Sequence, residues 1–419
     1  MAKIYPFRGL RYAPDRIPIE KAVTQPYDKI SKEMQDRYYE LHPNNIIRII
    51  LGKTSPEDSA ANNVYTRATE HLKEWRAAGI LEQLAEPAFF VYLQRFQAPG
   101  TTDIRVRKGF VGLGHLEDYS NKVIFPHERT LSGPKKDRLE LLRHTRMQFE
   151  QIFMLYEDPS QTIDRALDEV AAGAPAIVAN DEYGVRHTMW IVTDAKLVSR
   201  IQQEMADKKL IIADGHHRYE TALAFRDEMG GGPPYDRMPM TLFNMNSPGL
   251  TILPTHRVLS NLPDFDFGGM LRRAGEFFEI RDTAGDAKQI TIGVCAGRGE
   301  KISYLTLKSS LDLAAAMPDL SPKQRALDVV VLHRLVLEKC LGITEQAVTR
   351  ESYITYVRER DKAIHSVQSG RAQLAFLLNP TRIDQMRDIA YEGNVMPQKS
   401  TDFYPKLLSG LVMYAMEGA

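Results

Sequence analysis

A turn between a strand and a helix is the feature that most constrains how this chain folds. Residues 211–223 read IIADGHHRYETAL: an apolar run breaks at Asp214-Gly215, and a helical pattern begins at once. The apolar run favours a strand, and the first N–H groups of the following helix have no partner within that helix. Because the helix dipole also favours negative charge at this end, the turn is a candidate anion-binding site.

Four polar side chains crowd this turn: Asp214, His216, His217 and Arg218. A carboxylate acts as a base or holds a metal ion, an imidazole binds a metal or moves a proton, and a guanidinium clamps phosphate. The alternative is a solvated turn in which Asp214 caps the helix and the histidines pack. We favour the functional interpretation, because a packing turn does not need all four side chains.

Composition narrows the class of protein. The 419 residues carry 54 basic and 54 acidic side chains, so no overall field attracts nucleic acid, and no nucleic-acid partner is expected. No apolar run reaches the length that spans a membrane. The two cysteines, Cys295 and Cys340, stand far apart in apolar surroundings, which predicts free thiols and a reducing compartment. We therefore expect a cytoplasmic protein with no membrane partner.

The chain mixes helical and strand patterns, which predicts an α/β or α+β fold with a mixed-sheet core and flanking helices. A main domain is expected over residues 1–262, a smaller α+β lobe over 263–370, and a C-terminal segment, 371–419, that packs back on the main domain. Helices are expected near 55–78, 162–171, 216–227 and 324–340, and the segment 139–147 is amphipathic and basic. Strands are expected near 89–93, 105–113, 151–156, 187–192, 211–213, 240–245, 249–253, 289–294, 302–307 and 372–378.

A second polar cluster begins with His127, Glu128 and Arg129. An imidazole, a carboxylate and a guanidinium in consecutive residues cannot all face a core without partners. Arginine supplies a fork and lysine a point charge to a phosphate or pyrophosphate. The alternative is a solvated helix face with i,i+4 pairs, such as Glu140 with His144. The cations that follow in sequence are Lys135, Lys136, Arg138, Arg143 and Arg146.

Two further polar clusters are present: a third, formed by residues 244–249 and 254–257, and a fourth, around residues 399–401. Residues 244–249 (NMNSPG) and 254–257 (PTHR) would meet at one sheet edge if their strands form a hairpin, although ordinary turns also occur there. Near the C-terminus, Lys399, Ser400 and Thr401 offer one cation and two hydroxyls to an anion. This segment is not a P-loop, because the glycine-rich run before the lysine is missing. A turn that caps the last element is the alternative.

Several enzyme classes lack their motifs in this sequence. It contains no Gly-x-Ser-x-Gly elbow and no Cys-x-x-Cys pair. His216 and His217 are adjacent, so they point in different directions and do not form the i,i+4 zinc pair of a His-Glu-x-x-His helix. The chemistry that remains is carboxylate, imidazole and cation around phosphate, with a hard divalent ion as a candidate partner.

Five motifs extend from the first residues to the last: 6–12 (PFRGLRY), 26–28 (PYD), 126–130 (PHERT), 214–222 (DGHHRYETA) and 396–406 (MPQKSTDFYPK). Together they resemble a widespread prokaryotic family known as domain of unknown function 1015. One departure is Gln25, where the family pattern has a second proline before Pro26. This departure does not touch the residues expected to carry the chemistry, and the family name implies no activity.

The Asp-Gly-His-His-Arg turn is also similar, over a handful of residues, to the Asp-Gly-His-x-Arg motif of free-serine kinases in the ParB/sulfiredoxin-like superfamily. This resemblance implies a ParB/sulfiredoxin-like element with phosphate at the start of the helix. It implies that Asp214 is a base or metal ligand and that His216 and Arg218 bind the transferring phosphoryl group. It also implies that Gly215 lets the backbone approach closely. The resemblance to the domain of unknown function 1015 family suggests a place in serine metabolism.

The leading hypothesis is therefore a phosphotransferase that interconverts serine and a small phosphorylated metabolite, O-phosphoserine. ATP, ADP or pyrophosphate would be the donor, and Mg²⁺ is the expected metal ion. Either Glu128 or Asp214 would take the hydroxyl proton. One alternative is a phosphatase that uses the same residues with water in place of serine. The other is a regulatory module that holds a nucleotide at this turn and switches conformation.

Overall fold

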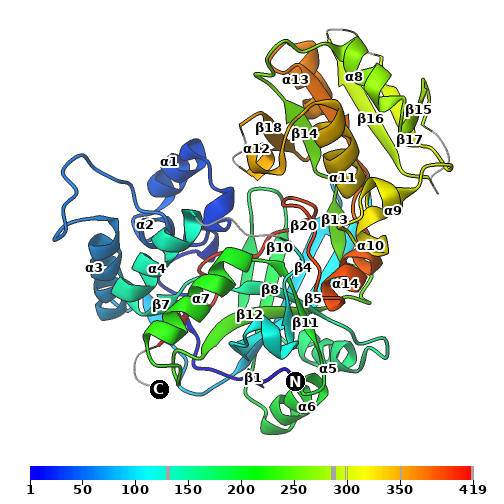
Figure 1. Ribbon diagram of the computed structural model, residues 1–419. Coiled ribbons are helices and arrows are strands. Elements are labelled where there is room, and N and C mark those ends of the chain that lie inside the picture. Colours follow the sequence, from blue (N-terminus) through cyan, green and yellow to red (C-terminus); the bar gives the residue numbers. More distant parts are fainter. Residues whose placement is uncertain (129–132, 285–288, 298, 300, 350–351, 417–419) are drawn as a thin grey trace. The chain divides into compact units, whose positions relative to one another are not determined.

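A computed structural model of the chain describes residues 1–128, 133–284, 289–297, 299, 301–349 and 352–416 (Figure 1). The chain divides into two compact units. Unit 1 comprises Met1–Pro126, Leu131–Thr251 and Pro405–Ala419, and unit 2 comprises His127–Thr130 and Ile252–Tyr404. The three-part division at residues 262 and 370 stays a prediction. In the part of the chain that is described, every helix is too short or too polar to cross a membrane.

Unit 1 is built on a nine-stranded mixed sheet. Eight strands follow the order β6-β11-β8-β12-β5-β4-β10-β9, and β1 pairs with β5. β12 runs antiparallel to β5 but parallel to β8, and β11 runs parallel to β6. The mixed α/β class expected from the sequence is thus confirmed. The strands of the sheet are β1 (Ile4–Tyr5), β4 (Phe89–Gln97), β5 (Ile104–His115), β6 (Ile124–Phe125), β8 (Ile152–Tyr156), β9 (Ile177–Asn180), β10 (Arg186–Val192), β11 (Leu210–Asp214) and β12 (Arg237–Asn244).

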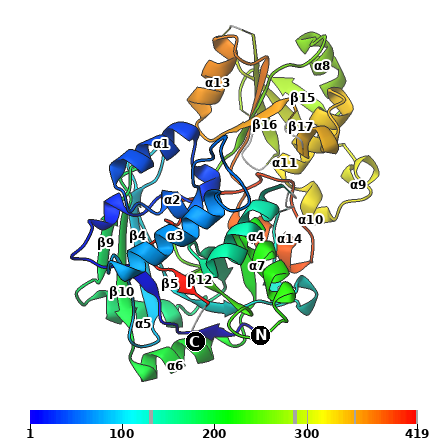
Figure 2. The ribbon, with the colours of Figure 1, turned by 90° about the vertical axis from the view of Figure 1, so that its left-hand side faces the viewer.

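Helices and short strand pairs surround this sheet within unit 1. α5 packs beside α6, and α4 packs beside α7 (Figure 2). The helices are η1 (Ile19–Lys21), η2 (Tyr27–Lys29), α1 (Lys32–Leu41), α2 (Ile47–Ile50), α3 (Val64–Ala77), η3 (Tyr119–Asn121), α4 (Gly133–Thr145), α5 (Thr162–Ala171), α6 (Ala195–Met205) and α7 (His216–Glu228). The short strands pair as β2 (Leu10–Tyr12) with β3 (Leu81–Gln83) and β7 (Met147–Gln148) with β21 (Tyr414–Ala415).

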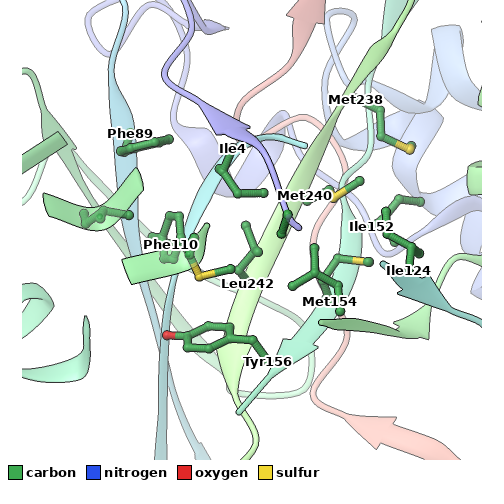
Figure 3. Close-up of a cluster of buried hydrophobic side chains, with 14 of the residues drawn as sticks. Ile4, Phe89, Phe110, Ile124, Ile152, Met154, Tyr156, Met238, Met240 and Leu242 are labelled. Carbon is green, nitrogen blue, oxygen red and sulfur yellow. The ribbon is translucent and has the colours of Figure 1, made fainter. Parts of the chain in front are cut away.

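The core of unit 1 lies on the central strands of the sheet. Phe89, Phe110, Met154 and Leu242 come from four neighbouring strands and are fully buried (Figure 3). Side chains of α5, α6 and α7 join the same cluster, so helices cover apolar strand positions. β8 is buried at every residue, which explains why its sequence, IFMLY, is an unbroken apolar run rather than an alternation.

Unit 2 contains an antiparallel six-stranded sheet in the order β15-β17-β16-β19-β14-β18. Cys295, Ala363 and Leu377 lie in its core, and both cysteines of the chain are buried and free, as expected. β13 (Thr251–Leu253) spans the boundary between the units. The other elements are β14 (His256–Leu259), α8 (Phe267–Ala274), β15 (Phe278–Arg281), β16 (Thr291–Ala296), β17 (Ser303–Leu307), α9 (Leu313–Ala316), α10 (Pro322–Arg325), α11 (Asp328–Val331), η4 (Leu332–Cys340), α12 (Glu345–Thr349), β18 (Ile354–Val357), α13 (Arg360–Gln368), β19 (Leu374–Leu377), α14 (Ile383–Tyr391) and β20 (Asp402–Tyr404).

Two helices differ from the sequence expectation. The helix expected from residue 55 begins at Val64, because Asn63 and Thr66 form a reciprocal capping box there. The Ser-Pro pair at 55–56 therefore starts no helix, although it resembles a helix start. The single helix expected over 324–340 is divided: α10 ends at Arg325, and the run that follows becomes a π-helix from Leu332.

Candidate functional site

The turn between β11 and α7 has the expected form. β11 ends at Asp214, and α7 begins at His216. Gly215 between them has φ +97°, which side chains other than glycine rarely adopt. A Cβ at this position would also lie 2.9 Å from Ile152 Cδ1 and 3.0 Å from Arg218 Nη2. Glycine is thus required both by the backbone and by the close approach of the arginine.

The carboxylate of Asp214 lies between two cations of unit 1. Arg218 Nη2 donates to Oδ2 at 2.9 Å, and Lys406 Nζ donates to Oδ1 at 2.8 Å. Burial disfavours the charge, but Lys406, Arg218 and Lys29 outweigh burial and hold the pKa of the Asp214 carboxyl well below its usual range. Asp214 is therefore ionised at neutral pH, and each of its oxygen atoms accepts from a cation.

Arg218 connects this carboxylate to the Pro-Tyr-Asp motif. Burial lowers the pKa of Arg218, but the carboxylates of Glu150, Asp214 and Asp28 raise it, so the guanidinium stays charged. Its Nη1 donates to the Gln151 carbonyl at 2.7 Å. Glu150, which is buried, accepts from the backbone N–H of Tyr27 at 3.1 Å. Tyr27 and Asp28, which the sequence marks only as part of a motif, and the neighbouring Lys29 thus contribute to the same cluster.

A further arginine, Arg107, is buried near the cluster around Asp214. Arg107 is fully buried between two aromatic rings, with its guanidinium carbon 4.4 Å from the centre of Phe153 and 4.7 Å from that of Phe243. Burial lowers the pKa of Arg107 to about 9, against the effect of Tyr92 and Asp214, so it remains a cation at pH 7. A buried cation held between ring faces is favourably placed for cation–π attraction.

Arg107 and Gln94 hold the backbone that carries Lys406. Arg107 donates to Gln94 Oε1 and to the carbonyl of Pro405, and Gln94 Nε2 donates to the carbonyl of Lys406 at 2.8 Å. Two successive carbonyl groups are thus fixed by side chains of the sheet. This arrangement positions the Lys406 ammonium on Asp214, 192 residues away in sequence.

The cations of α4 lie in the same unit but have their own partners. Lys135 pairs with Glu220, and Arg138 donates to Asp137 and to the Ile50 carbonyl. The Arg138 guanidinium also lies over the Tyr27 ring, 4.2 Å from its centre. Lys136 is exposed. Of the cations that the sequence assigns to phosphate binding, Lys135 and Arg138 are therefore paired with carboxylates of the protein itself.

Both histidines lie in the first turn of α7 and are half-buried. Burial lowers the pKa of His217, with Glu220 acting against this and Lys135 reinforcing it. His217 is therefore neutral at pH 7, because its ordinary value is already below 7. A neutral imidazole can accept a proton, which a charged one cannot.

The second and fourth sequence clusters meet in unit 2. Glu128 accepts from Lys399 N at 3.1 Å, from Thr401 N at 2.8 Å and from Thr401 Oγ1 at 2.9 Å. His127 Nε2 lies 2.7 Å from the same hydroxyl, and Ser400 Oγ donates to the Pro397 carbonyl at 2.5 Å. These contacts fix the turn at 399–401. Arg129, the remaining expected residue of this cluster, lies outside the described residues.

The expected site residues thus form two groups, one in each unit. The third sequence cluster is divided in the same way. In unit 1, Asn244 donates to Asp164 Oδ2 at 2.6 Å and accepts from Asp158 N at 3.0 Å. These hydrogen bonds give Asn244 a structural role. In unit 2, the buried Arg257 donates to the Lys399 carbonyl at 2.9 Å, and burial lowers the pKa of Arg257 to about 10.

The surroundings of Asp214 do not fit the expected magnesium ion. Mg²⁺ prefers oxygen ligands in octahedral geometry, whereas both oxygens of Asp214 accept from positively charged groups. Among the described residues, no three Asp, Glu, His or Cys side chains are grouped so that they could hold a metal ion. We therefore assign no step to a metal bound by Asp214.

A family model described as "Protein of unknown function (DUF1015)" matches residues 4–330 of the 419. The chain belongs to this family. No curated protein matches this DUF1015 protein.

Several solved structures are distantly similar to this DUF1015 protein. A conserved hypothetical protein from Pyrococcus furiosus is 11% identical, with a TM-score of 0.36, over 70% of this chain and 93% of its own. A free serine kinase in complex with AMP is 12% identical, with a TM-score of 0.36, over 69% and 89%. SbnI with a C-terminal truncation, from Staphylococcus aureus, is 12% identical, with a TM-score of 0.38, over 71% and 85%. Similarities this distant do not indicate an activity.

Proposed function

We propose that this protein is a phosphotransferase that interconverts free serine and O-phosphoserine at the turn between β11 and α7, with ATP, ADP or pyrophosphate as donor. The observation that carries the proposal is the convergence of Arg218, Lys406 and Lys29 on Asp214 at the start of α7. Phosphoryl transfer depends mainly on positioning and on stabilising negative charge, and this cluster supplies cations held in fixed places.

The mixture of charges favours a ligand of amino-acid type over a simple polyanion. Alongside the cations, the cluster contains the carboxylates of Asp28, Glu150 and Asp214, all of which act on the pKa of Arg218. A bare phosphate would be repelled by these groups, whereas O-phosphoserine carries an ammonium group that they attract. Its phosphate and carboxylate groups suit the arginine and the lysines.

A small cavity beside the cluster agrees with a small ligand. Its volume is about 50 Å³, and Glu150, Arg218, Thr221 and Met147 are among its lining residues. A cavity needs about 10–15 Å³ of such volume to hold one water molecule, so this cavity has room for a group of a few non-hydrogen atoms. The side chain of serine is such a group.

We assign the following roles. Arg218 and Lys406 bind the phosphoryl oxygens, and ionised Asp214 holds these two cations in place. Asp214 is a poor general base, because its low pKa gives it little affinity for a proton. His217 is neutral at pH 7, so its imidazole is in the state that accepts the hydroxyl proton. The serine Oγ–P bond forms as the bond between phosphorus and the donor oxygen breaks.

The test is product formation by the purified chain. Serine is incubated with Mg²⁺ and, separately, ATP, ADP or pyrophosphate, and O-phosphoserine is sought by mass spectrometry, alongside the reverse reactions. We expect O-phosphoserine with one donor, loss of product in Arg218→Gln, and no loss in Arg143→Gln. The Arg143 side chain, a candidate in the sequence, pairs with Glu140 and with Glu228 at the other end of α7. Release of phosphate from O-phosphoserine without an acceptor would replace the kinase by a phosphatase. No reaction in either direction would reject serine chemistry.

A further inference from the structure

A second pocket in unit 1 takes no part in the proposed phosphoryl transfer. Its volume is about 180 Å³, and it is formed by η1, α1, the turn after β9, and the segment around Leu408. For comparison, an engineered cavity of about 150 Å³ in another protein holds benzene. The pocket is therefore large enough for an organic molecule of about six non-hydrogen atoms.

The pocket carries negative charge. The lining residues that are charged at neutral pH are Glu20, Asp181, Glu182 and Arg37, so three acidic groups face one basic group. Burial opposes the charge of Asp181, but its hydrogen bonds with His187 and with the backbone N–H groups of Val185 and Tyr183 help to hold its pKa below the usual value. At neutral pH the pocket therefore has an excess of two negative charges, which attracts a cation.

The hydrogen bonds distinguish the three carboxylates. Asp181 is saturated: Oδ1 accepts from the N–H groups of Tyr183 and Val185, each at 2.9 Å, and Oδ2 accepts from Gln25 at 3.1 Å and lies 3.3 Å from His187 Nε2. Asp181 therefore sets the local charge and the shape of the turn, and it has little capacity for another donor.

Glu182 and Glu20 retain acceptor capacity. Glu182 Oε1 accepts from the hydroxyl of Tyr38 and from Arg37 Nη2 at 3.4 Å, but its Oε2 accepts only a long contact from Gln25 at 3.5 Å. Glu20 accepts from Asn180 N at 3.4 Å. A carboxylate offers about four acceptor positions, so both groups can accept from a further donor.

The rest of the lining is partly apolar. Its apolar lining residues include Val23 and Leu408, which are buried, and Leu41, which is 40% exposed. A bare metal ion does not suit such a wall, and no group of three metal-ligating side chains exists among the described residues. An ammonium group on a short hydrocarbon chain suits both the carboxylates and the apolar residues.

We infer that this pocket binds a small organic cation, with a primary ammonium group at Glu182 and Glu20 and a short aliphatic chain against Val23, Leu41 and Leu408. This inference is independent of the proposed phosphoryl transfer, because none of these residues belongs to the cluster at α7.

The test is calorimetric titration of the full chain with butylammonium chloride at pH 7, with sodium chloride and 1-butanol as controls for ionic strength and for the apolar chain. We expect saturable binding of butylammonium alone. Glu182→Gln is expected to weaken it about tenfold, because the amide removes one negative charge and a charge-assisted hydrogen bond from the ammonium group. Leu41→Trp, which enlarges an accessible side chain in the pocket lining, is expected to abolish it.

Glu169→Gln on the exposed face of α5 is the matched control and should bind as the unchanged chain does. Circular dichroism establishes that each variant is folded, and Leu41→Trp decides the matter if Glu182→Gln does not fold. Absence of saturable binding would overturn the inference. Equal binding by Leu41→Trp, or binding of 1-butanol as strong as that of butylammonium, would overturn it as well.

Discussion

At the residue scale, the cluster depends on one glycine and one carboxylate. Gly215 permits both the turn and the approach of Arg218, and Asp214 joins two cations that arise far apart in sequence. The sequence predicted the importance of 214–218, because polar residues at the start of a helix are visible without a structure. It did not predict that Asp214 would be held by Lys406, because no local pattern connects the two.

Gly215→Ala is expected to destabilise the fold by about 1–3 kcal/mol, because alanine at φ +97° is strained and its Cβ would push against Arg218. Urea unfolding measures the change in free energy. Gly232→Ala is the control, since a Cβ there meets no atom within 4 Å and its φ is outside the left-handed region. Equal stability of the two variants would contradict the close approach of Arg218.

Asp214→Asn is expected to lower stability at pH 7 by on the order of 2–3 kcal/mol, because it leaves two largely buried cations without their counter-ion. The folded-state pKa of Asp214 is depressed, so its contribution is present above the ordinary value near 4 and is lost as the pH falls below it. The difference from the unchanged chain should therefore shrink below about pH 4. Unfolding at a series of pH values measures this, and a difference that grows on acidification would contradict the ion pairs.

At the element scale, most strands and helices of unit 1 follow from periodicity, while their pairing does not. α5 lies at 162–171 and β10 at 186–192, close to expectation, because both have clear apolar patterns. In the sequence, Arg107 stands only within a predicted strand. In the structure, its side chain holds the backbone next to Lys406. The order β8-β12-β5-β4, which brings Arg107 and Gln94 to the segment around Pro405, depends on tertiary pairing that one sequence does not reveal.

Arg107→Lys tests this link between the sheet and the C-terminal segment. Lysine keeps the charge but lacks the planar fork that contacts Gln94 and the Pro405 carbonyl together. We expect a loss of about 2 kcal/mol in stability, weaker binding of O-phosphoserine through displacement of Lys406, and no comparable change in Arg105→Lys on the same strand. Urea unfolding and titration with O-phosphoserine are the measurements. Unchanged binding of O-phosphoserine in a folded Arg107→Lys variant would show that the segment is positioned in another way.

At the scale of the whole molecule, the sequence predicted the mixed α/β class. The family model matches residues 4–330, which contain four of the five motifs that resemble this family, and 396–406 lies beyond the match. The candidate residues are predicted to surround a single phosphate group, and this stays a prediction. They belong to two units: His127 and Glu128 contact 399–401, whereas Asp214 and Arg218 belong to the unit that contains Lys406. Which distant segments these residues contact depends on tertiary folding, which a local sequence pattern does not show.

The measurement that tests the central claim most directly is calorimetric titration of O-phosphoserine into the unchanged chain, Lys406→Gln and Arg143→Gln. We predict binding to the unchanged chain and to Arg143→Gln, with affinity reduced about tenfold or more in Lys406→Gln, since a charge-assisted hydrogen bond to phosphate contributes at least about 1.5 kcal/mol. Circular dichroism and unfolding confirm that Lys406→Gln is folded. Absence of binding to the unchanged chain, or equal binding by the folded Lys406→Gln variant, would contradict the claim that the cluster at the start of α7 is the phosphate site.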